Sequence, residues 1–254
     1  MAFDLSSISR TRRVAAPKIL LAGDSKIGKS TFAASAPGSI GILTEDGMAG
    51  IDGQAFPLCT TLADVYSCIG TLLNEEHEFQ TAYLDSLDWL EPLVHAHVCA
   101  LNQWADIETP GYGKGYAAAA REWKTLLEGF EQLRVQRGMG VILICHVKQK
   151  HIELPTADGF DAIVLKLHDK ATALCEEWAD VIGYAAHRVA LKEVKAAFGQ
   201  KEKKALKSSE RVLYLEAHPA YPSGNRFGLT DCPLSWEAFA TQLSLANNPQ
   251  PQAA

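Results

Sequence analysis

The sequence predicts a three-layer α/β fold built around a mostly parallel central sheet. Short apolar runs, rich in β-branched residues and leucine, alternate along the chain with longer amphipathic segments. This alternation is typical of parallel strands joined by helices. Most of the first four runs lack an alternating polar position, as expected for central strands covered by helices on both faces. The expected strands are residues 17–23, 39–44, 81–85, 140–146, 180–186 and 211–217.

Amphipathic segments lie between the expected strands. No break in composition and no internal repeat divides the chain, so we expect one core domain over residues 17–246. Residues 1–16 are rich in serine and arginine and are expected to form an arm, and residues 247–254 a polar disordered tail. The expected helices are residues 29–36, 62–76, 89–106, 117–137 and 170–179.

The charge of the chain is unevenly distributed. Its 254 residues carry 30 acidic and 24 basic side chains, a net charge of -6, which argues against a protein that coats duplex DNA by bulk charge. Between residues 30 and 113 there is no lysine or arginine, against 12 aspartates and glutamates. Hydrophobic residues make up 47% of the chain, which excludes wholesale disorder. The separation of acidic from basic residues along the chain permits, and favours, a localised site for a single strand of nucleic acid.

The cysteines and the termini indicate a cytoplasmic protein. The six cysteines are scattered, with no Cys-x-x-Cys pair, which argues against a disulfide framework or a zinc site. The first residues lack the apolar core of a signal peptide, and no apolar stretch is long enough to span a bilayer. We therefore expect reduced thiols and no association with a membrane.

The strongest motif is G-x-x-x-x-G-K-S at residues 23–30, which follows an expected strand and opens an expected helix. Its glycines let backbone N–H groups wrap around phosphates, while Lys29 reaches the β- and γ-phosphates and the Ser30 hydroxyl ligates Mg²⁺. A chance glycine turn is the alternative, and the full pattern in this context favours a nucleotide site. The expected nucleotide-binding residues are Gly23, Asp24, Ser25, Lys26, Ile27, Gly28, Lys29, Ser30 and Thr31.

Two acidic side chains end neighbouring expected strands. Asp85 closes the run TAYLD and is the candidate for supporting magnesium, although Asp88 could compete for that role and a helix-capping aspartate is the alternative. Glu45 ends the run SIGILTE and is the leading candidate for the base that polarises the attacking water. Asp46 beside it is read as loop surface, and an exposed turn is the alternative for Glu45 as well.

These motifs together resemble those of a known family. In chain order, GDSKIGKS, ILTEDG, AYLDS and VILICH resemble the phosphate loop, catalytic glutamate, magnesium-linked aspartate and polar sensor of RecA-like ATPases. The segments GYGKGYAAAAREW, KLHDKATALCEEWADVIGYA and NRFGL resemble phage-encoded, core-only members that serve as single-strand annealing or recombination proteins. The resemblance covers residues 18–239 and implies a RecA-like phosphate-loop NTPase fold, with ATP and Mg²⁺ as cofactors.

The resemblance assigns roles to individual residues. It implies that Lys29 and Ser30 bind nucleotide, with Glu45 as the catalytic carboxylate. It also implies that His146 senses the γ-phosphate, where RecA uses an amide; a capped strand end is the alternative. Arg226 resembles the arginine finger inserted into a neighbouring subunit's site, although Gly224 stands where related patterns often carry a lysine. An ordinary solvent-exposed arginine is the alternative for that position.

The resemblance also implies two DNA-binding loops, at residues 109–116 and 147–160. The first offers stacking rings and a phosphate contact, and the second offers lysines; plain connectors are the alternative for both. A third segment, residues 188–211, carries eight lysines and arginines against three glutamates and is expected to form a long hairpin or excursion. A solvated charged loop is its alternative. The candidate DNA-binding residues are Tyr112, Lys114, Tyr116, Lys148 and Lys150.

The expected function is ATP-dependent binding of single-stranded DNA with annealing or recombination. Hydrolysis is expected to depend on DNA and to occur at Mg²⁺-dependent sites between subunits of a filament or ring. A single-strand DNA-binding protein is a further candidate partner, and the cytoplasm of a bacterial host is the expected location. The alternatives are a replicative-helicase-like motor and an ATP-gated DNA-binding module with negligible turnover. A small-molecule kinase is the weakest, because no lid-like arginine cluster lies near the phosphate loop.

Overall fold

A mostly parallel sheet forms the centre of the protein. The computed structural model describes residues 16–154, 157–195 and 201–247. Within these residues, nine strands form one sheet in the order β11-β9-β8-β1-β5-β4-β2-β3, and β10 pairs with β8 beside that path. Its strands are β1 (Lys18–Gly23), β2 (Ser39–Leu43), β3 (Gln54–Ala55), β4 (Thr81–Asp85), β5 (Gly140–Cys145), β8 (Val181–Lys195), β9 (Lys201–Tyr214), β10 (Gly224–Asn225) and β11 (Cys232–Pro233).

The strand directions bring the predicted site residues to one edge. From β8 through β1, β5, β4 and β2 to β3, every neighbouring pair is parallel. The strands β9, β10 and β11 pair antiparallel to their neighbours. Because the central strands run in one direction, their carboxyl ends meet at the same edge, where ligands bind in α/β sheets. The phosphate loop follows β1 at this edge, and Asp85 ends β4 there.

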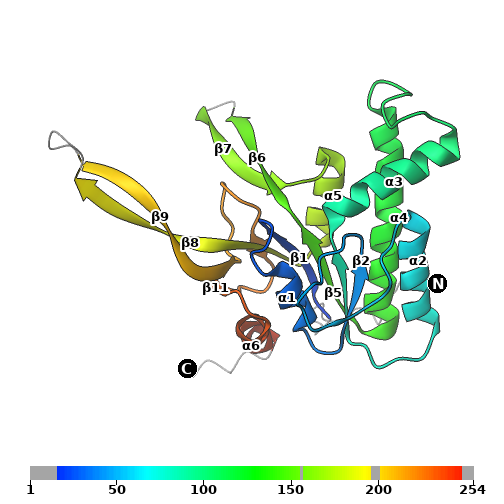
Figure 1. Ribbon diagram of the computed structural model, residues 1–254, viewed down its shortest axis with the longest axis horizontal. Helices are drawn as coiled ribbons and strands as arrows, with labels where there is room; N and C mark the ends of the chain where they lie inside the picture. The colour runs from blue at the N-terminus through cyan, green and yellow to red at the C-terminus, as the bar shows by residue number, and fades with distance from the viewer. Residues whose placement is uncertain (1–15, 155–156, 196–200, 248–254) are drawn as a thin grey trace, which may run out of the picture.

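Two hydrophobic layers enclose the sheet. One face packs against α2, α3, α4 and α5 around Trp123 and Phe130, and the other packs against α1 and α6 around Phe32 and Phe239. In Figure 1, α2, α3 and α4 lie side by side on one flank, and α6 lies apart near β11. The helices are α1 (Lys29–Ala34), α2 (Leu62–Asn74), α3 (Leu87–Asn102), α4 (Lys114–Arg137), α5 (Asp169–Trp178) and α6 (Trp236–Asn247).

Local sequence explains where several helices begin and end. A capping box on α2, in which Thr61 and Asp64 bond each other's backbone amides, fixes its first turn. The helix α3 ends at Asn102, short of the expected 106, because Gln103 adopts a left-handed conformation with φ of 57°. At the far end of α4, Gly138 takes φ of 67°, which glycine adopts at little cost. The expected three-layer α/β fold with a mostly parallel sheet is confirmed.

Two long hairpins leave the body of the protein (Figure 1). Strands β6 (Val147–Leu154) and β7 (Ala157–Leu165) pair antiparallel as a separate two-stranded sheet. Strands β8 and β9 continue beyond the central sheet, so the expected strands 180–186 and 211–217 are the inner part of a hairpin that holds the basic segment. Of the expected arm and tail, only residues 16 and 247 lie among the described residues.

Candidate functional site

The phosphate loop connects β1 to α1 and surrounds the Lys29 side chain. Gly28 takes φ of 114°, a conformation that side-chain-bearing residues rarely adopt, so the second glycine of the motif is required by the turn. The Lys29 ammonium donates to the carbonyl oxygens of Gly23 at 2.9 Å and Asp24 at 2.8 Å. Burial lowers the pKa of Lys29, while Asp85 nearby favours its charged form. The loop therefore holds a buried cation at its centre.

A hydrogen bond of 2.6 Å joins the Ser30 hydroxyl to the Asp85 carboxylate. Asp85 is 3% exposed at the end of β4, and burial raises its pKa. A serine hydroxyl and a carboxylate are oxygen donors of the kind that Mg²⁺ prefers. These two side chains thus fit the expected magnesium position, because they lie together beside Lys29.

A chain of hydrogen bonds links Glu45 to His146. The Ser86 hydroxyl lies 2.9 Å from both Glu45 Oε1 and Asp88 Oδ1, and its single hydrogen serves one carboxylate at a time. Asp88 in turn lies 3.0 Å from His146 Nδ1 and accepts from the His146 backbone amide at 3.1 Å. The candidate base and the candidate sensor are therefore connected through two side chains of the β4–α3 junction.

The two carboxylates of this hydrogen-bonded series, Glu45 and Asp88, have pKa values shifted in opposite directions. Burial raises the pKa of Glu45, against the opposing hydrogen bond from Ser86. Burial acts in the same direction on Asp88, but hydrogen bonds from His146 and Ser86 outweigh it and hold the Asp88 pKa well below its usual range. Lys166 adds a cation 3.5 Å from Asp88. Asp88 is thus an anion whose position is fixed by hydrogen bonds from His146. It differs in this from Asp85, whose carboxylate accepts from the Ser30 hydroxyl.

One cavity is lined by three candidate catalytic residues, Lys29, Glu45 and His146, but not by Arg226. It has a volume of about 630 Å³ and is lined by the phosphate loop together with Glu45, Asp85, His146 and Arg211. Arg211 belongs to β9, and its guanidinium donates to the Ile27 carbonyl at 3.1 Å. Sequence reasoning missed Arg211 at this site because its contact spans 184 positions. It also missed Ser86, whose only signal is that it directly follows Asp85.

A comparison with protein families gives one match over most of the chain. The sequence model of a family described as an AAA domain matches residues 15–227. The chain belongs to this family. Among solved structures, one titled "Crystal structure of the RadB recombinase" matches with a TM-score of 0.44 and 16% sequence identity, covering 83% of this chain and 86% of that one. A comparison with curated proteins gives no match.

Family membership agrees with the architecture of this AAA domain. The strand β5 lies between the phosphate-loop strand β1 and the Asp85 strand β4, and Glu45 follows β2 on the far side of β4. The chain therefore has an α/β phosphate-loop fold in which four sequence motifs meet at one cavity. None of the helices among the described residues is long and apolar enough to cross a membrane.

Arg226 lies away from the phosphate loop of its own AAA domain. Its guanidinium lies 3.3 Å from Asp180 Oδ1, and its backbone amide donates to the Asp180 carbonyl. The backbone amide of Asp180 donates to the carbonyl of Lys18. Lys18 is the first residue of β1, so it lies at the opposite end of that strand from the phosphate loop. Within its own chain, Arg226 therefore does not line the cavity that holds the phosphate loop.

The first expected DNA-binding segment is a series of turns that leads into α4. Tyr112 projects with its side chain fully exposed, at 101%, between two glycines of positive φ. Tyr116, by contrast, stacks on the His168 ring with centroids 4.0 Å apart and donates to Glu108. Lys114 is the first residue of α4. Of the two candidate stacking tyrosines, only Tyr112 is fully exposed.

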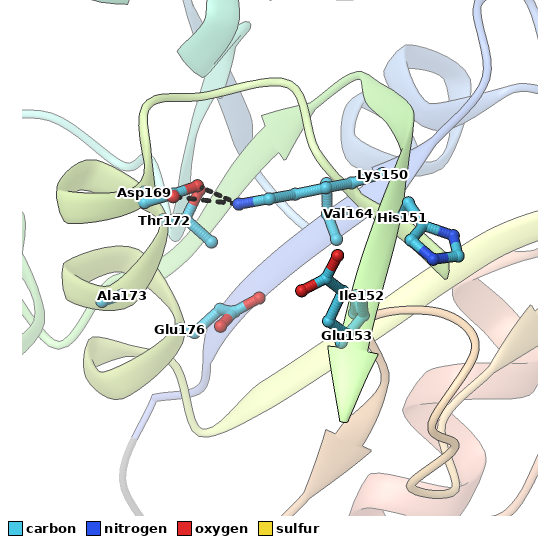
Figure 2. Close-up of a pocket in the computed structure, with 9 residues that line it drawn as sticks. All are labelled: Lys150, His151, Ile152, Glu153, Val164, Asp169, Thr172, Ala173 and Glu176. Atoms are coloured by element: carbon cyan, nitrogen blue, oxygen red, sulfur yellow. Dashed lines mark hydrogen bonds and ion pairs between the residues drawn. The ribbon is translucent and has the colours of Figure 1, made fainter. Parts of the chain in front are cut away.

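The second expected DNA-binding segment is a hairpin and not a loop. Of this segment, residues 147–154 form β6 and residues 157–160 form the start of β7, because their backbone groups pair across an antiparallel ladder. Lys148 donates to the Leu167 carbonyl at 2.9 Å, and Lys150 pairs with Asp169 at 2.8 Å. Figure 2 shows Lys150 reaching across a cavity between β6 and α5, with His151 on the other side of the strand. Both lysines thus have partners within the chain.

The basic segment 188–211 is a hairpin, as the sequence suggested. Its backbone forms the outer part of β8 and β9, with Lys195 opposite Lys201 at the last described pair. At its root, the exposed Arg188 pairs with Glu210 at 3.2 Å. The side chains of residues 189–207 lie outside the described part of the structure. The hairpin therefore extends a basic stretch of sequence away from the sheet (Figure 1).

Proposed function

We propose that this AAA domain hydrolyses ATP with Mg²⁺, binds single-stranded DNA, and promotes annealing or recombination as a filament or ring. The observation that carries this proposal is the meeting of Lys29, the Ser30–Asp85 pair, Glu45 and His146 around one cavity. The core is residues 17–246, and the protein acts in the cytoplasm of a phage-infected bacterial cell. A single-strand DNA-binding protein is a candidate partner.

The site supports hydrolysis by positioning and charge. Glu45 accepts a proton from the attacking water. The water oxygen forms a bond to the γ-phosphorus as the bond between the γ-phosphorus and the β–γ bridging oxygen breaks. The electron pair of that bond leaves with ADP. Lys29 stabilises the charge on the phosphate oxygens. Ser30 and Asp85 would hold magnesium, which when bound would supply further neutralisation of phosphate charge.

The hydrogen-bonded series from Glu45 to His146 ends beside the β6–β7 hairpin, which can respond to the nucleotide. His146 joins the end of β5 to the start of β6, so a contact between its ring and the γ-phosphate would act on the β6–β7 hairpin. Tyr112 and the basic β8–β9 hairpin are the proposed contacts to the strand, through stacking and through phosphate charges. Arg226 acts in trans on a neighbouring subunit's nucleotide, which makes hydrolysis depend on assembly.

Imaging the assembly tests this proposal. The protein is examined by negative-stain microscopy with single-stranded DNA, a non-hydrolysable ATP analogue, both, or neither, and annealing of complementary strands is measured in parallel. We expect filaments or rings only when both ligands are present, and annealing that requires nucleotide. Monomers under all four conditions, with no annealing, would contradict the proposal.

The same preparation separates the two alternatives. Unwinding of a forked duplex without partner proteins would support a helicase-like motor. Tight ATP binding with no turnover, and no effect of Glu45→Gln, would support an ATP-gated binding module.

A further inference from the structure

Arg211 reaches the phosphate loop from a strand that is remote in sequence. It lies on β9, opposite His187 of β8, and β8 pairs with the phosphate-loop strand β1. Its carbonyl oxygen accepts from the Leu234 amide at 3.1 Å. The backbone of Arg211 is thus fixed at the root of the β8–β9 hairpin, two strands away from the loop.

The guanidinium of Arg211 lies directly against the glycine that precedes Lys29. Nη1 donates to the Ile27 carbonyl at 3.1 Å. A Cβ atom placed on Gly28 would lie only 2.7 Å from the same nitrogen. Together with Lys29 and Ser30, Arg211 lines the cavity that holds the candidate catalytic carboxylates. A second cation therefore stands at the wall of the phosphate-binding cavity.

The charge of Arg211 is left available for an anion. The neighbouring Glu210 pairs with Arg188 at 3.2 Å, and within the described ranges no carboxylate forms an ion pair with Arg211. The cavity carboxylates Glu45 and Asp85 bond to Ser86 and Ser30. A guanidinium carries five N–H donors in a planar fork that matches phosphate oxygens, and the Ile27 carbonyl is a weak partner for its charge.

We propose that Arg211 is a second cationic residue of the nucleotide site, which donates from the same chain to the phosphates of a bound nucleoside triphosphate. The proposal rests on the proposed ATP site. It differs from the role of Arg226, which acts across a subunit boundary. Because Arg211 belongs to β9, bound nucleotide would also connect the phosphate loop to the root of the basic hairpin.

The test compares three substitutions that separate charge from bracing of the loop. Arg211→Ala removes both, Arg211→Gln keeps an amide that can donate to the Ile27 carbonyl but removes the charge, and Arg211→Lys keeps a charge. Arg121→Gln, at an exposed position on α4, is the matched control. Binding of fluorescent ATP and ADP is titrated at fixed Mg²⁺, and the melting temperature of each variant is measured without nucleotide.

Arg211→Ala and Arg211→Gln should both weaken ATP binding by roughly tenfold or more, as expected for loss of a charge-assisted hydrogen bond. Arg211→Lys should keep most of the affinity, and Arg121→Gln should bind as the wild type does. The melting temperature of Arg211→Gln should stay close to that of the wild type.

Wild-type affinity in Arg211→Gln would overturn the proposal. If Arg211→Ala alone bound ATP weakly, Arg211 would only brace the loop. If both Arg211→Ala and Arg211→Gln bound ATP as the wild type does, Arg211 would have no part in binding. Should Arg211→Ala fail to fold, Arg211→Gln and Arg211→Lys still decide whether the charge of Arg211 contributes to nucleotide binding. A wild-type protein that binds no nucleotide would overturn the proposed function itself, and this proposal with it.

Discussion

One carboxylate oxygen of Asp88 holds His146 at two points, accepting from its backbone amide at 3.1 Å and lying 3.0 Å from its ring Nδ1. Because the pKa of Asp88 lies well below its usual range, the carboxylate is ionised and Nδ1 is assigned as the donor. The orientation of the candidate sensor is thus set by the first turn of α3. This contact also ties the end of β5 to the junction that follows Asp85.

Asp88→Asn should slow ATP hydrolysis by about 10–100-fold, the usual cost of losing a group that orients a functional side chain. The affinity for ATP should change little, because the Lys29 ammonium donates to the Gly23 and Asp24 carbonyls and not to Asp88. Steady-state hydrolysis and nucleotide titration measure the two effects. Asp158→Asn, an exposed aspartate on β7, is the control. Unchanged turnover in Asp88→Asn would show that His146 needs no such support.

Asp85→Asn should lower Mg²⁺-dependent hydrolysis by roughly 10²-fold or more and raise the Mg²⁺ concentration needed for half-maximal rate. The reason is the 2.6 Å contact between Asp85 and the Ser30 hydroxyl, which places the carboxylate at the expected metal position. A magnesium titration of the rate measures both effects. If the variant retained the wild-type magnesium dependence, the metal would be held elsewhere, with Asp88 as the remaining carboxylate of this junction.

The pH profile of hydrolysis should carry the signature of Glu45. Burial raises the Glu45 pKa, and a base must be ionised to accept a proton, so the rate should fall with decreasing pH at a higher pH than an ordinary carboxylate gives. The hydrogen bond from Ser86 lowers this pKa, so Ser86→Ala should move the acid limb upward. Rates measured from about pH 5 to pH 8 test both statements. An acid limb that stays in place, or moves down, in Ser86→Ala argues against Glu45 as the base.

Tyr112→Ala should weaken binding of single-stranded DNA by roughly 5- to 150-fold, the range for loss of one base-stacking ring. The Tyr112 side chain is fully exposed, whereas Tyr116 is stacked on His168. Val135→Ala, an exposed position in the last turn of α4, is the control. Binding is measured by fluorescence anisotropy with a labelled oligonucleotide. Equal affinity of Tyr112→Ala and the wild type would remove this segment from the interface.

Gly115→Ala should destabilise the protein by about 1–3 kcal/mol. A Cβ atom at Gly115 would overlap the Ile107 carbonyl oxygen, so the chain before α4 must shift to admit it. Gly129→Ala is a matched control in the same helix, where the Cβ meets Ile69 at an ordinary 3.5 Å and should be neutral or stabilising by up to about 1 kcal/mol. Denaturant unfolding compares the two. Equal stabilities would show that the approach of Ile107 is easily relaxed.

Much of the candidate site could be predicted because its signals are local. The phosphate loop is a contiguous motif, and Glu45, Asp85 and His146 each follow an apolar run that reads as a strand. Parallel pairing of those strands then brings the three side chains to one edge. The sequence could not show the contacts between them. Asp88 binds a residue 58 positions away, and that choice depends on how α3 packs beside β5.

The hairpins show a different limit of prediction. The run at residues 147–152 mixes lysine, glutamine and histidine with valine and isoleucine, a polar composition that reads as a loop. The antiparallel ladder with β7 satisfies its backbone and leaves many of its side chains exposed. The sequence predicts a strand that starts at Arg211, and the strand that contains Arg211, β9, does lie in the sheet. Its contact with the Ile27 carbonyl follows from the pairing order β9-β8-β1, which no local pattern encodes.

Steady-state ATP hydrolysis, measured with and without single-stranded DNA in the wild type and in Lys29→Ala, decides whether the phosphate loop supports DNA-stimulated turnover. We expect magnesium-dependent hydrolysis by the wild type that single-stranded DNA stimulates, and loss of that hydrolysis in Lys29→Ala. Hydrolysis that persists undiminished in Lys29→Ala, or a wild type that shows no turnover with DNA present, would contradict this expectation.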